Sequence, residues 1–219
     1  MDFTVILDNA PILLRGFGYT LFVAFATIAL SLVLAVPLAI IRESKWRRAA
    51  MIVAGYSWIA RATPALTVLF VTYYGLPVLG IYLEPLISAI LGLTLVSTGY
   101  NLEFVRAGLR AVPAGQIDAA KSLGLSPYRT LRLVILPQAM VVAVPPLVSN
   151  MTLMVKGSTL ASLVAVSELT GEAVALIAST YKSLEILLTV ALAYLAVNTL
   201  LAVAQSRIEK RLARPTATA

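Results

Sequence analysis

Residues 115–137, GQIDAAKSLGLSPYRTLRLVILP, decide the fold of this chain because they join two helices without a long loop. The residues up to Leu123 have the composition of a short amphipathic helix, which Gly124 interrupts. Ser126 and Pro127 follow as an N-cap and a first helical residue, so a new helix begins there. The stretch therefore predicts a helix–glycine–helix elbow over residues 113–130.

Long apolar runs lie on both sides of this elbow. Hydrophobic residues make up 60% of the 219 residues and charged residues 12%, whereas a soluble domain carries about 25% charged residues. Crossing the hydrocarbon core of a bilayer takes about 20 apolar residues in a helix. Five stretches meet or approach this length, and none alternates as barrel strands do. They are residues 16–41, 62–83, 85–102, 133–155 and 186–206.

The basic residues predict the orientation of these spans. Most of the 17 lysines and arginines fall in alternate connections. They are Arg42, Lys45, Arg47 and Arg48 in the first; Arg106, Arg110, Lys121, Arg129 and Arg132 in the second; and Arg207, Lys210, Arg211 and Arg214 in the tail. Basic connections stay in the cytoplasm. We therefore expect one all-α integral membrane domain over residues 1–219 with five transmembrane helices, its N-terminus outside and its C-terminus cytoplasmic.

The same composition excludes several functions. The chain has no Cys and no His, which removes disulfides, thiol nucleophiles, thiolate metal sites and imidazole acid–base chemistry. No phosphate-cradling Walker loop is present. The net charge of +7 is accounted for by topology, so nucleic-acid binding is not needed to explain it. We expect no catalytic residue and no metal site in this chain.

The elbow resembles the cytoplasmic signature of the inner-membrane permeases of ATP-binding-cassette (ABC) importers, commonly written E-A-A-x3-G-x9-I-x-L-P. Asp118, Ala119 and Ala120 match its opening, and Gly124 lies at the required spacing. Residues 134–137, VILP, match its close. Asp118 and Val134 are conservative departures from Glu and Ile. An amphipathic helix lying on the membrane surface is the alternative, but it would not need the glycine and the proline at these positions.

Other stretches narrow the resemblance to the polar amino acid permeases, which include histidine, arginine, glutamine and opine importers. Residues 61–64, RATP, and 73–77, YYGLP, resemble RGTP…YYGLP of that family, with Ala62 in place of Gly. Residues 97–108, STGYNLEFVRAG, are similar to SGAYLAEIVRGG. PPLV at 145–148 and KGSTL at 156–160 resemble PPLVN…LLKDTSL. Gly157 replaces the usual Asp, which puts an acidic role there in doubt.

The resemblance implies a type I ABC-importer transmembrane domain in a prokaryotic plasma (inner) membrane. In that family the elbow is the coupling helix that docks on the ATPase subunit. Here the coupling residues would be Gly115, Asp118, Ala119, Ala120, Gly124 and Pro137. The implied partners are a cytoplasmic ABC ATPase homodimer, a second permease copy or a paralogue, an extracytoplasmic solute-binding protein and membrane lipid. ATP and Mg²⁺ would be bound by the ATPase, and no cofactor by this chain.

Polar residues inside the predicted spans are candidates for the solute path, because burying them in lipid is unfavourable. Ser149, Asn150 and Thr152 follow the Pro145–Pro146 pair, and Asn150 is the first choice. The alternative for Asn150 is a hydrogen bond between helices. Tyr100 faces either the path or the membrane interface, where tyrosines often lie.

A second group of polar and charged residues is assigned to a gate or to structure. Lys156 and Thr159 begin the stretch that leads to Glu168, and we expect this stretch near an outer gate. Glu103 lies three residues before Arg106, so the two form an ion pair, or Glu103 partners Arg61.

Two other functions remain open at the level of sequence. An ATP-independent channel or secondary transporter is opposed by five spans without an internal repeat and by the lack of a mid-span carboxylate for a proton relay. A membrane-bound lipid-processing enzyme is opposed by the lack of His and of paired acidic motifs. Metal-dependent turnover of a lipid by the purified chain would favour the enzyme.

Overall fold

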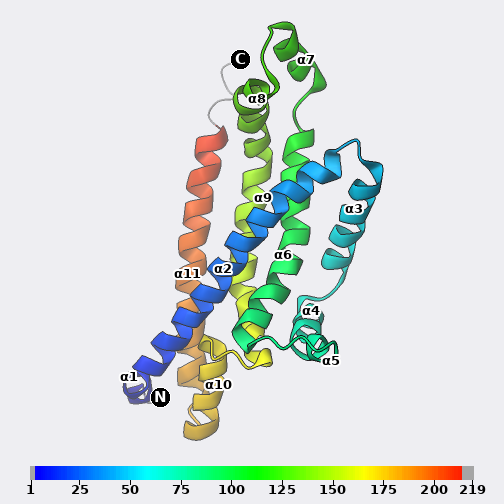
Figure 1. Cartoon of the computed structure of the whole chain (residues 1–219). Coiled ribbons are helices and arrows are strands. Elements are labelled where there is room, and N and C mark those ends of the chain that lie inside the picture. The colour runs from blue at the N-terminus through cyan, green and yellow to red at the C-terminus, as the bar shows by residue number, and fades with distance from the viewer. Residues whose placement is uncertain (1–2, 214–219) are drawn as a thin grey trace.

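The computed structural model describes residues 3–213, and every regular element within them is a helix (Figure 1). The elements in chain order are α1 (Thr4–Asp8), α2 (Ala10–Glu43), α3 (Arg47–Ala62), α4 (Ala65–Phe70), η1 (Val71–Gly75), α5 (Leu76–Val78), α6 (Pro85–Arg110), α7 (Ala114–Ser122), α8 (Pro127–Thr130), η2 (Leu131–Ile135), α9 (Leu136–Gly157), η3 (Ser158–Val164), α10 (Leu169–Thr180) and α11 (Ser183–Ala213). The expected all-α class is confirmed.

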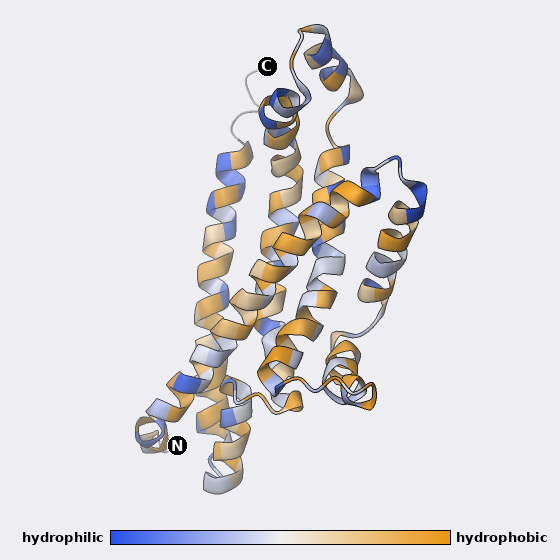
Figure 2. Ribbon diagram, in the orientation of Figure 1, coloured by the Kyte–Doolittle hydropathy of each residue, from blue (hydrophilic) through white to orange (hydrophobic). Residues whose placement is uncertain are grey.

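Four helical stretches of the described residues are long and apolar enough to cross a membrane. They are Ala10–Glu43, Pro85–Arg110, Pro127–Val164 and Ser183–Leu212. Figure 2 shows hydrophobic residues along the middle of these helices and hydrophilic residues at the elbow end of α2 and α11. Each stretch is longer than the apolar run from which it was predicted, because the helices continue through charged residues at their ends.

The predicted second span, residues 62–83, is not one helix. Helix α3 ends at Ala62, and Thr63 is extended with ψ 133°. A residue before proline is disfavoured in the α region, and Thr63 precedes Pro64. A shorter apolar helix then covers Ala65–Val78 and ends before Gly80, whose φ is +80°. The apolar run is therefore divided by its own proline and glycine.

Helix α6 lies at the centre of the bundle and packs against α2, α3, α4 and α9. Two glycines of α6 permit this close packing. A Cβ atom at Gly99 would lie 2.5 Å from the Ala60 Cβ atom of α3, and one at Gly108 would lie 2.5 Å from the Ala139 carbonyl oxygen of α9. The absence of these side chains lets α6 contact both neighbours at once.

The elbow has the conformation predicted from its sequence. Gly124 has φ +72°, and its N–H donates to the Lys121 carbonyl at 2.9 Å. The Leu125 N–H donates to the Ala120 carbonyl at 3.1 Å, which completes a Schellman motif at the end of α7. The Ser126 side chain then accepts from the Arg129 N–H, so α8 is capped at its start.

The chain reverses at the opposite end of the bundle through two short helices, η3 and α10 (Figure 1). Ala165 joins them in the left-handed conformation, with φ 61°. Val164 and Ala161 of η3 are fully buried against Val23 and Leu93. The connection therefore packs into the bundle instead of extending from it.

Candidate functional site

A cavity of about 600 Å³ gathers several of the polar residues that were predicted from sequence. It lies between the α3–α4 junction, α6 and α9, and its volume is in the range of about 300–1,000 Å³ typical of small-molecule sites. Its lining includes Arg61, Thr63, Tyr100, Ser149 and Asn150. The break at Pro64, which the sequence analysis missed, places Arg61 and Tyr100 at the same cavity.

Asn150 connects α9 to α6 and is only 4% exposed. Its Nδ2 donates to Ser97 Oγ at 3.0 Å and to Asn101 Oδ1 at 2.8 Å. Asn101 Nδ2 donates in turn to Ser31 Oγ of α2 at 3.0 Å. Asn150 thus makes the interhelical hydrogen bonds that were the alternative prediction, and it also lines the cavity. Its Oδ1 accepts no hydrogen bond from the described residues.

The other cavity residues are held by local bonds. The Tyr100 hydroxyl donates to the Arg61 carbonyl at 3.4 Å, and Arg61 Nε donates to the Ser57 carbonyl at 3.2 Å. Ser149 Oγ donates to the Pro145 carbonyl at 3.1 Å and accepts from Gln205 Nε2 of α11 at 2.9 Å. The polar residues of the cavity wall are therefore Arg61, Thr63, Tyr100, Ser149 and Asn150, and the rest of the wall is apolar.

Thr152 does not belong to this group. Its Oγ1 is buried without a hydrogen-bond partner among the described residues, and the residue is absent from the cavity wall. Two positions beyond Asn150 on a helix turn the side chain by about 200°, so the two residues face opposite ways. Lys156 and Thr159 also lie away from the cavity, with Thr159 Oγ1 donating to the Lys156 carbonyl at 2.9 Å.

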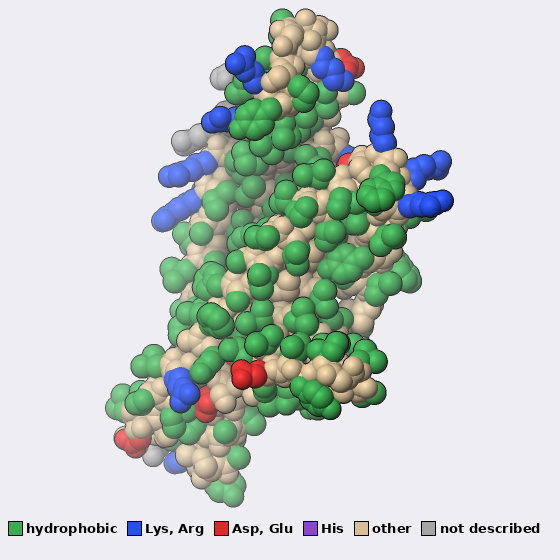
Figure 3. Space-filling model, in the orientation of Figure 1, with side chains coloured by type: hydrophobic (Ala, Val, Ile, Leu, Met, Phe, Trp, Pro, Cys, Tyr) green, Lys and Arg blue, Asp and Glu red, His purple; other side chains and the backbone are tan. Residues whose placement is uncertain are grey.

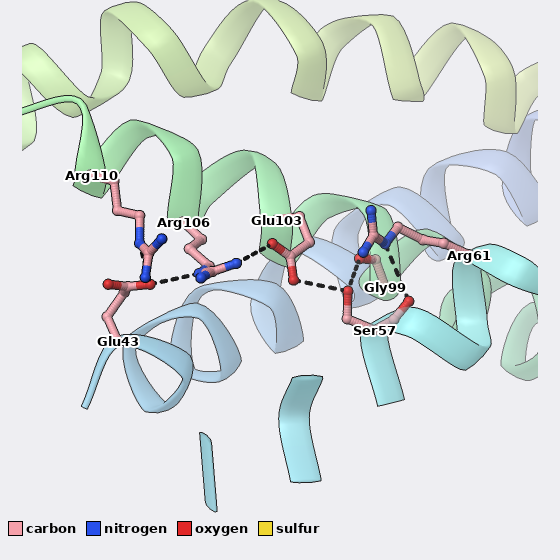
Figure 4. A network of polar contacts seen from close by, with 7 residues as sticks. All are labelled: Glu43, Ser57, Arg61, Gly99, Glu103, Arg106 and Arg110. Atoms are coloured by element: carbon pink, nitrogen blue, oxygen red, sulfur yellow. Dashed lines mark hydrogen bonds and ion pairs between the residues drawn. The ribbon is translucent and has the colours of Figure 1, made fainter. Parts of the chain in front are cut away.

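A charged network runs from the end of α2 to the cavity (Figure 4). Glu43 accepts from Arg106 Nε at 2.6 Å and from Arg110 Nε at 2.8 Å. Arg106 Nη1 pairs with Glu103 at 2.8 Å, which confirms the predicted ion pair. Ser57 Oγ of α3 donates to the same Glu103 at 3.1 Å.

This network ties together α2, α6 and α3, and it reaches Arg61 through Ser57, whose carbonyl binds the guanidinium. Glu43 was missed from the sequence. In the sequence, Glu43 stands out as the single acidic residue in a link that is otherwise rich in Arg and Lys. The side chains of Glu43, Glu103 and Arg106 are 17–29% exposed, so the charges are partly withdrawn from solvent.

The elbow exposes four of the five coupling residues predicted within it. Gly115, Asp118, Ala119 and Gly124 are exposed, and Asp118 pairs with Lys121 at 3.0 Å. Ala120 is only 3% exposed, because it faces the second half of the elbow. Leu123 and Tyr128, missed from the sequence, are 81% and 68% exposed at the tip. Such exposed apolar side chains fit a protein-docking surface.

Pro137 directly follows the π-helical turn η2 within the continuous helical stretch Pro127–Val164, so its missing N–H removes one backbone hydrogen bond inside this stretch. Gln138 beside it donates to Gln116 of α7 and to the Val134 carbonyl. These bonds join the elbow to the helix that carries Asn150.

Glu168 is a buried carboxylate that the sequence analysis placed only in a gate segment. It is fully buried and caps α10 by accepting from the Gly171 N–H at 2.8 Å. Its other oxygen accepts from the Thr20 hydroxyl of α2 and from the Tyr194 hydroxyl of α11, both at 3.0 Å. Three elements at the end opposite the elbow therefore converge on one side chain. Residues 3–213 hold no group of three acidic or other metal-ligating residues.

Comparisons with known proteins agree with this arrangement. Residues 31–214 match the family model of the "binding-protein-dependent transport system inner membrane component". The nopaline transport system permease protein of Agrobacterium fabrum is 34% identical over 205 residues, covering 89% of this chain and 85% of that protein. A probable glutamine ABC transporter permease protein of Bacillus subtilis is 35% identical over 207 residues, covering 93% and 95%.

Solved structures give the same result for the fold. A chain from a structure described as an amino acid ABC transporter with histidines superposes with a TM-score of 0.88 at 27% identity. The superposition covers 96% of this chain and 99% of that one. A methionine ABC transporter in an inward-facing conformation superposes with a TM-score of 0.77 at 21% identity.

Proposed function

Because this chain belongs to the family of binding-protein-dependent transport system inner membrane components, as the permease component of an amino-acid ABC importer, we propose that its 600 Å³ cavity is part of the solute path. The chain is a multi-pass protein of the bacterial inner membrane, and ATP hydrolysis belongs to a separate subunit. The channel, carrier and lipid-enzyme alternatives are thereby set aside.

The cavity carries this proposal because its polar groups suit an amino acid. The Arg61 guanidinium would bind the α-carboxylate, since Arg and carboxylate form strong charge-assisted hydrogen bonds. The free Oδ1 of Asn150 would accept from the α-ammonium group, and Ser149 and Tyr100 would complete the polar wall. The remaining lining, which includes Leu153, Met154 and Phe104, is apolar and leaves room for a side chain.

We propose that the chain crosses the membrane five times. Helix α3 and the shorter Ala65–Val78 helix together form the second, broken crossing between α2 and α6. The elbow end would be cytoplasmic, and the N-terminal end of α2 and helix α10 would lie outside. The gathering of Lys and Arg toward the elbow end supports this orientation (Figure 3). Arg214 of the predicted basic tail lies outside the described residues.

The family implies an ATPase and a solute-binding protein as partners. We propose that two ATPase subunits dock on the elbows of two permease subunits, through Leu123, Tyr128 and the exposed face of α7. ATP binding would close the ATPase dimer and open the solute path to the outside. ATP hydrolysis would then return the path to its inward-facing state. The second permease would be a copy of this chain or a paralogue, and the chain itself would bind no cofactor.

The charged network supplies a physical route between the two sites. Arg110 lies four residues before α7, and Glu103 and Ser57 connect the same helix to the segment that carries Arg61. A movement of the elbow would therefore be transmitted to the cavity through ion pairs and hydrogen bonds, and not only through the connecting loops.

Substitution of Arg61 tests the proposed solute site. In proteoliposomes with the partner ATPase and solute-binding protein, we expect Arg61→Gln to raise the KM for amino acid uptake at least tenfold, the effect of losing about 1.4 kcal/mol of binding. ATPase activity without solute should be unchanged. Lys45→Gln, which alters a basic residue away from the cavity, is the control. An unchanged KM in Arg61→Gln would remove Arg61 from the solute path.

A further inference from the structure

The charges around the proposed solute cavity are unbalanced. Arg61 is the one charged side chain that residues 3–213 contribute to the wall of this cavity, whose volume is about 600 Å³. The other side chains of the wall are hydroxyl, amide or apolar groups. A solute in the cavity therefore meets a positive charge of this chain and no negative one.

Glu103 is the carboxylate whose charge interacts with Arg61, but it does not line the cavity. One of its oxygens accepts from Arg106 Nη1 at 2.8 Å, and the other accepts from Ser57 Oγ at 3.1 Å. Figure 4 shows both oxygens directed along the charged network, toward Arg106 on one side and Ser57 on the other. Both carboxylate oxygens are thus bound within the bundle.

The network as a whole keeps an excess of positive charge. Glu43 pairs with both Arg106 and Arg110. Arg106 also pairs with Glu103, so two carboxylates balance these two guanidiniums. Arg61 remains as the third guanidinium, at the end of the network that borders the cavity. Because the surroundings are apolar, its charge acts on a bound solute more strongly than it would in water.

The remaining carboxylates of the described residues lie away from the cavity. Glu168 is buried at the end opposite the elbow, where it accepts from hydroxyls of α2 and α11. Asp118 pairs with Lys121 in the elbow, and Glu209 accepts from Gln205. The wall of the cavity also lacks the other acidic residues of this part of the chain, which are Asp8, Glu84, Glu172 and Glu185.

This imbalance matters because every amino acid already carries one cationic group. With the α-carboxylate at Arg61, the α-ammonium group would donate to Asn150 Oδ1. A second cation, on the solute side chain, would lie against apolar wall residues such as Leu153 without a carboxylate. Burying an unpaired charge is unfavourable, and a like charge nearby adds repulsion. The rings of Tyr100 and Phe104 would attract a cation only weakly compared with a carboxylate.

We propose that the cavity selects amino acids whose side chain carries no positive charge. Arg61 then has two roles, because it anchors the α-carboxylate and also repels a cationic side chain. The inference names the substrate class of the proposed solute site and rests on that site. A carboxylate added to the wall should admit cationic side chains, because it would supply the missing opposite charge.

Protection of a single cysteine tests this selectivity at the cavity, without the solute-binding protein. The chain has no native cysteine, and Leu153→Cys places one in the wall at a side chain that is 58% exposed. The assembled importer in nanodiscs is treated with N-ethylmaleimide at constant ionic strength, and mass spectrometry measures the labelling rate of this chain. The added solutes are two matched pairs, citrulline with arginine and norleucine with lysine. The members of each pair have similar length and differ in side-chain charge.

We expect citrulline and norleucine to slow the labelling at concentrations about tenfold lower than arginine and lysine, respectively. Tyr181→Cys is the control, because this side chain is 87% exposed and does not line the cavity. Its labelling rate should be the same with all four solutes.

Two variants of Ser149 in the Leu153→Cys background separate charge from shape. Ser149→Asp adds a carboxylate to the wall, and Ser149→Asn adds a neutral group of the same size. Compared with Ser149→Asn, we expect Ser149→Asp to lower the protecting concentrations of arginine and lysine about tenfold and to leave those of citrulline and norleucine nearly unchanged. A steric effect would be the same in both variants.

The possible outcomes distinguish this inference from the proposed function. Equal protection by the neutral and cationic members of both pairs would overturn the inference and leave the cavity as a solute site. The same holds if Ser149→Asp and Ser149→Asn show the same preference. If none of the four solutes protects Leu153→Cys, the cavity is not a solute site, and both the proposed function of the cavity and the inference are wrong.

Discussion

At the scale of single residues, hydrogen bonds explain how polar side chains are accommodated inside so apolar a bundle. The buried Asn150 amide donates to Asn101 across α9 and α6, and Asn101 donates in turn to Ser31 of α2, so these amide groups are held inside the bundle. Among residues 3–213, the Arg61 guanidinium makes one hydrogen bond, from its Nε to the Ser57 carbonyl; its charge also interacts with Glu103, and the residue lines the cavity. A polar side chain thus stabilises the bundle when its partners lie on neighbouring helices, and it can bind solute when part of it faces a cavity.

Glu168 leads to a prediction about stability. Glu168→Ala removes the acceptor of the Thr20 and Tyr194 hydroxyls, and a buried donor without an acceptor costs roughly 1–3 kcal/mol. We expect a lower midpoint of thermal unfolding for the purified chain in detergent. The loss should be smaller in Glu168→Gln, which retains one acceptor oxygen. Glu172→Ala, one turn further along α10, is the control.

Samples are heated to a series of temperatures, and size-exclusion chromatography measures how much monodisperse protein remains after each. Wild-type stability in Glu168→Ala would show that the three helices are held together by packing alone. The residues of the Leu13–Leu169–Ile186 cluster would then account for the junction of α2, α10 and α11.

At the scale of elements, the elbow is the part of the fold best determined by local chemistry. Gly124, Ser126 and Pro127 end one helix and begin the next without help from distant residues. The same is true of the break between α3 and α4, where Pro64 acts on the conformation of Thr63. The difference is that Pro64 lies at the start of an apolar run that is long enough to be taken as one span.

Gly124 also allows a test of coupling. Its φ of +72° is unfavourable for a residue with a Cβ atom, by about 1–2 kcal/mol, and a large side chain would also disturb the docking surface. We expect Gly124→Trp to insert normally but to lose solute-stimulated ATPase activity in the assembled importer. Gly55→Trp is the control, since a Cβ atom at Gly55 meets nothing within 4 Å. Normal stimulation in Gly124→Trp would count heavily against the elbow as the coupling site.

At the scale of the whole molecule, the two ends of the bundle differ in chemistry. The elbow end holds the basic connections and the Glu43–Arg106–Glu103 network. The opposite end holds η3, α10 and the buried Glu168. The proposed solute cavity lies between them, which is the placement that an alternating-access mechanism needs.

The proposed topology can be tested directly because the chain has no cysteine. Single cysteines at Leu7, Leu123 and Tyr181 replace side chains that are 76%, 81% and 87% exposed. We expect a membrane-impermeant maleimide to label Leu7→Cys and Tyr181→Cys in cells whose outer barrier alone is opened. Leu123→Cys should be labelled only after the inner membrane is permeabilised. The reverse pattern would invert the proposed orientation.

The sequence alone determined the helical class, the long apolar helices, the elbow with its capping residues and the family. These depend on composition, on local conformational preference and on motifs read along the chain, so no distant contact was needed. Only the tertiary structure decided that Ala120 is buried and that Glu43 joins the Glu103–Arg106 pair. It also brought Arg61, Tyr100 and Asn150 to one cavity. These features depend on how helices cross, and crossing is set by side chains far apart in sequence, such as Gly99 against Ala60 and Gly108 against Ala139.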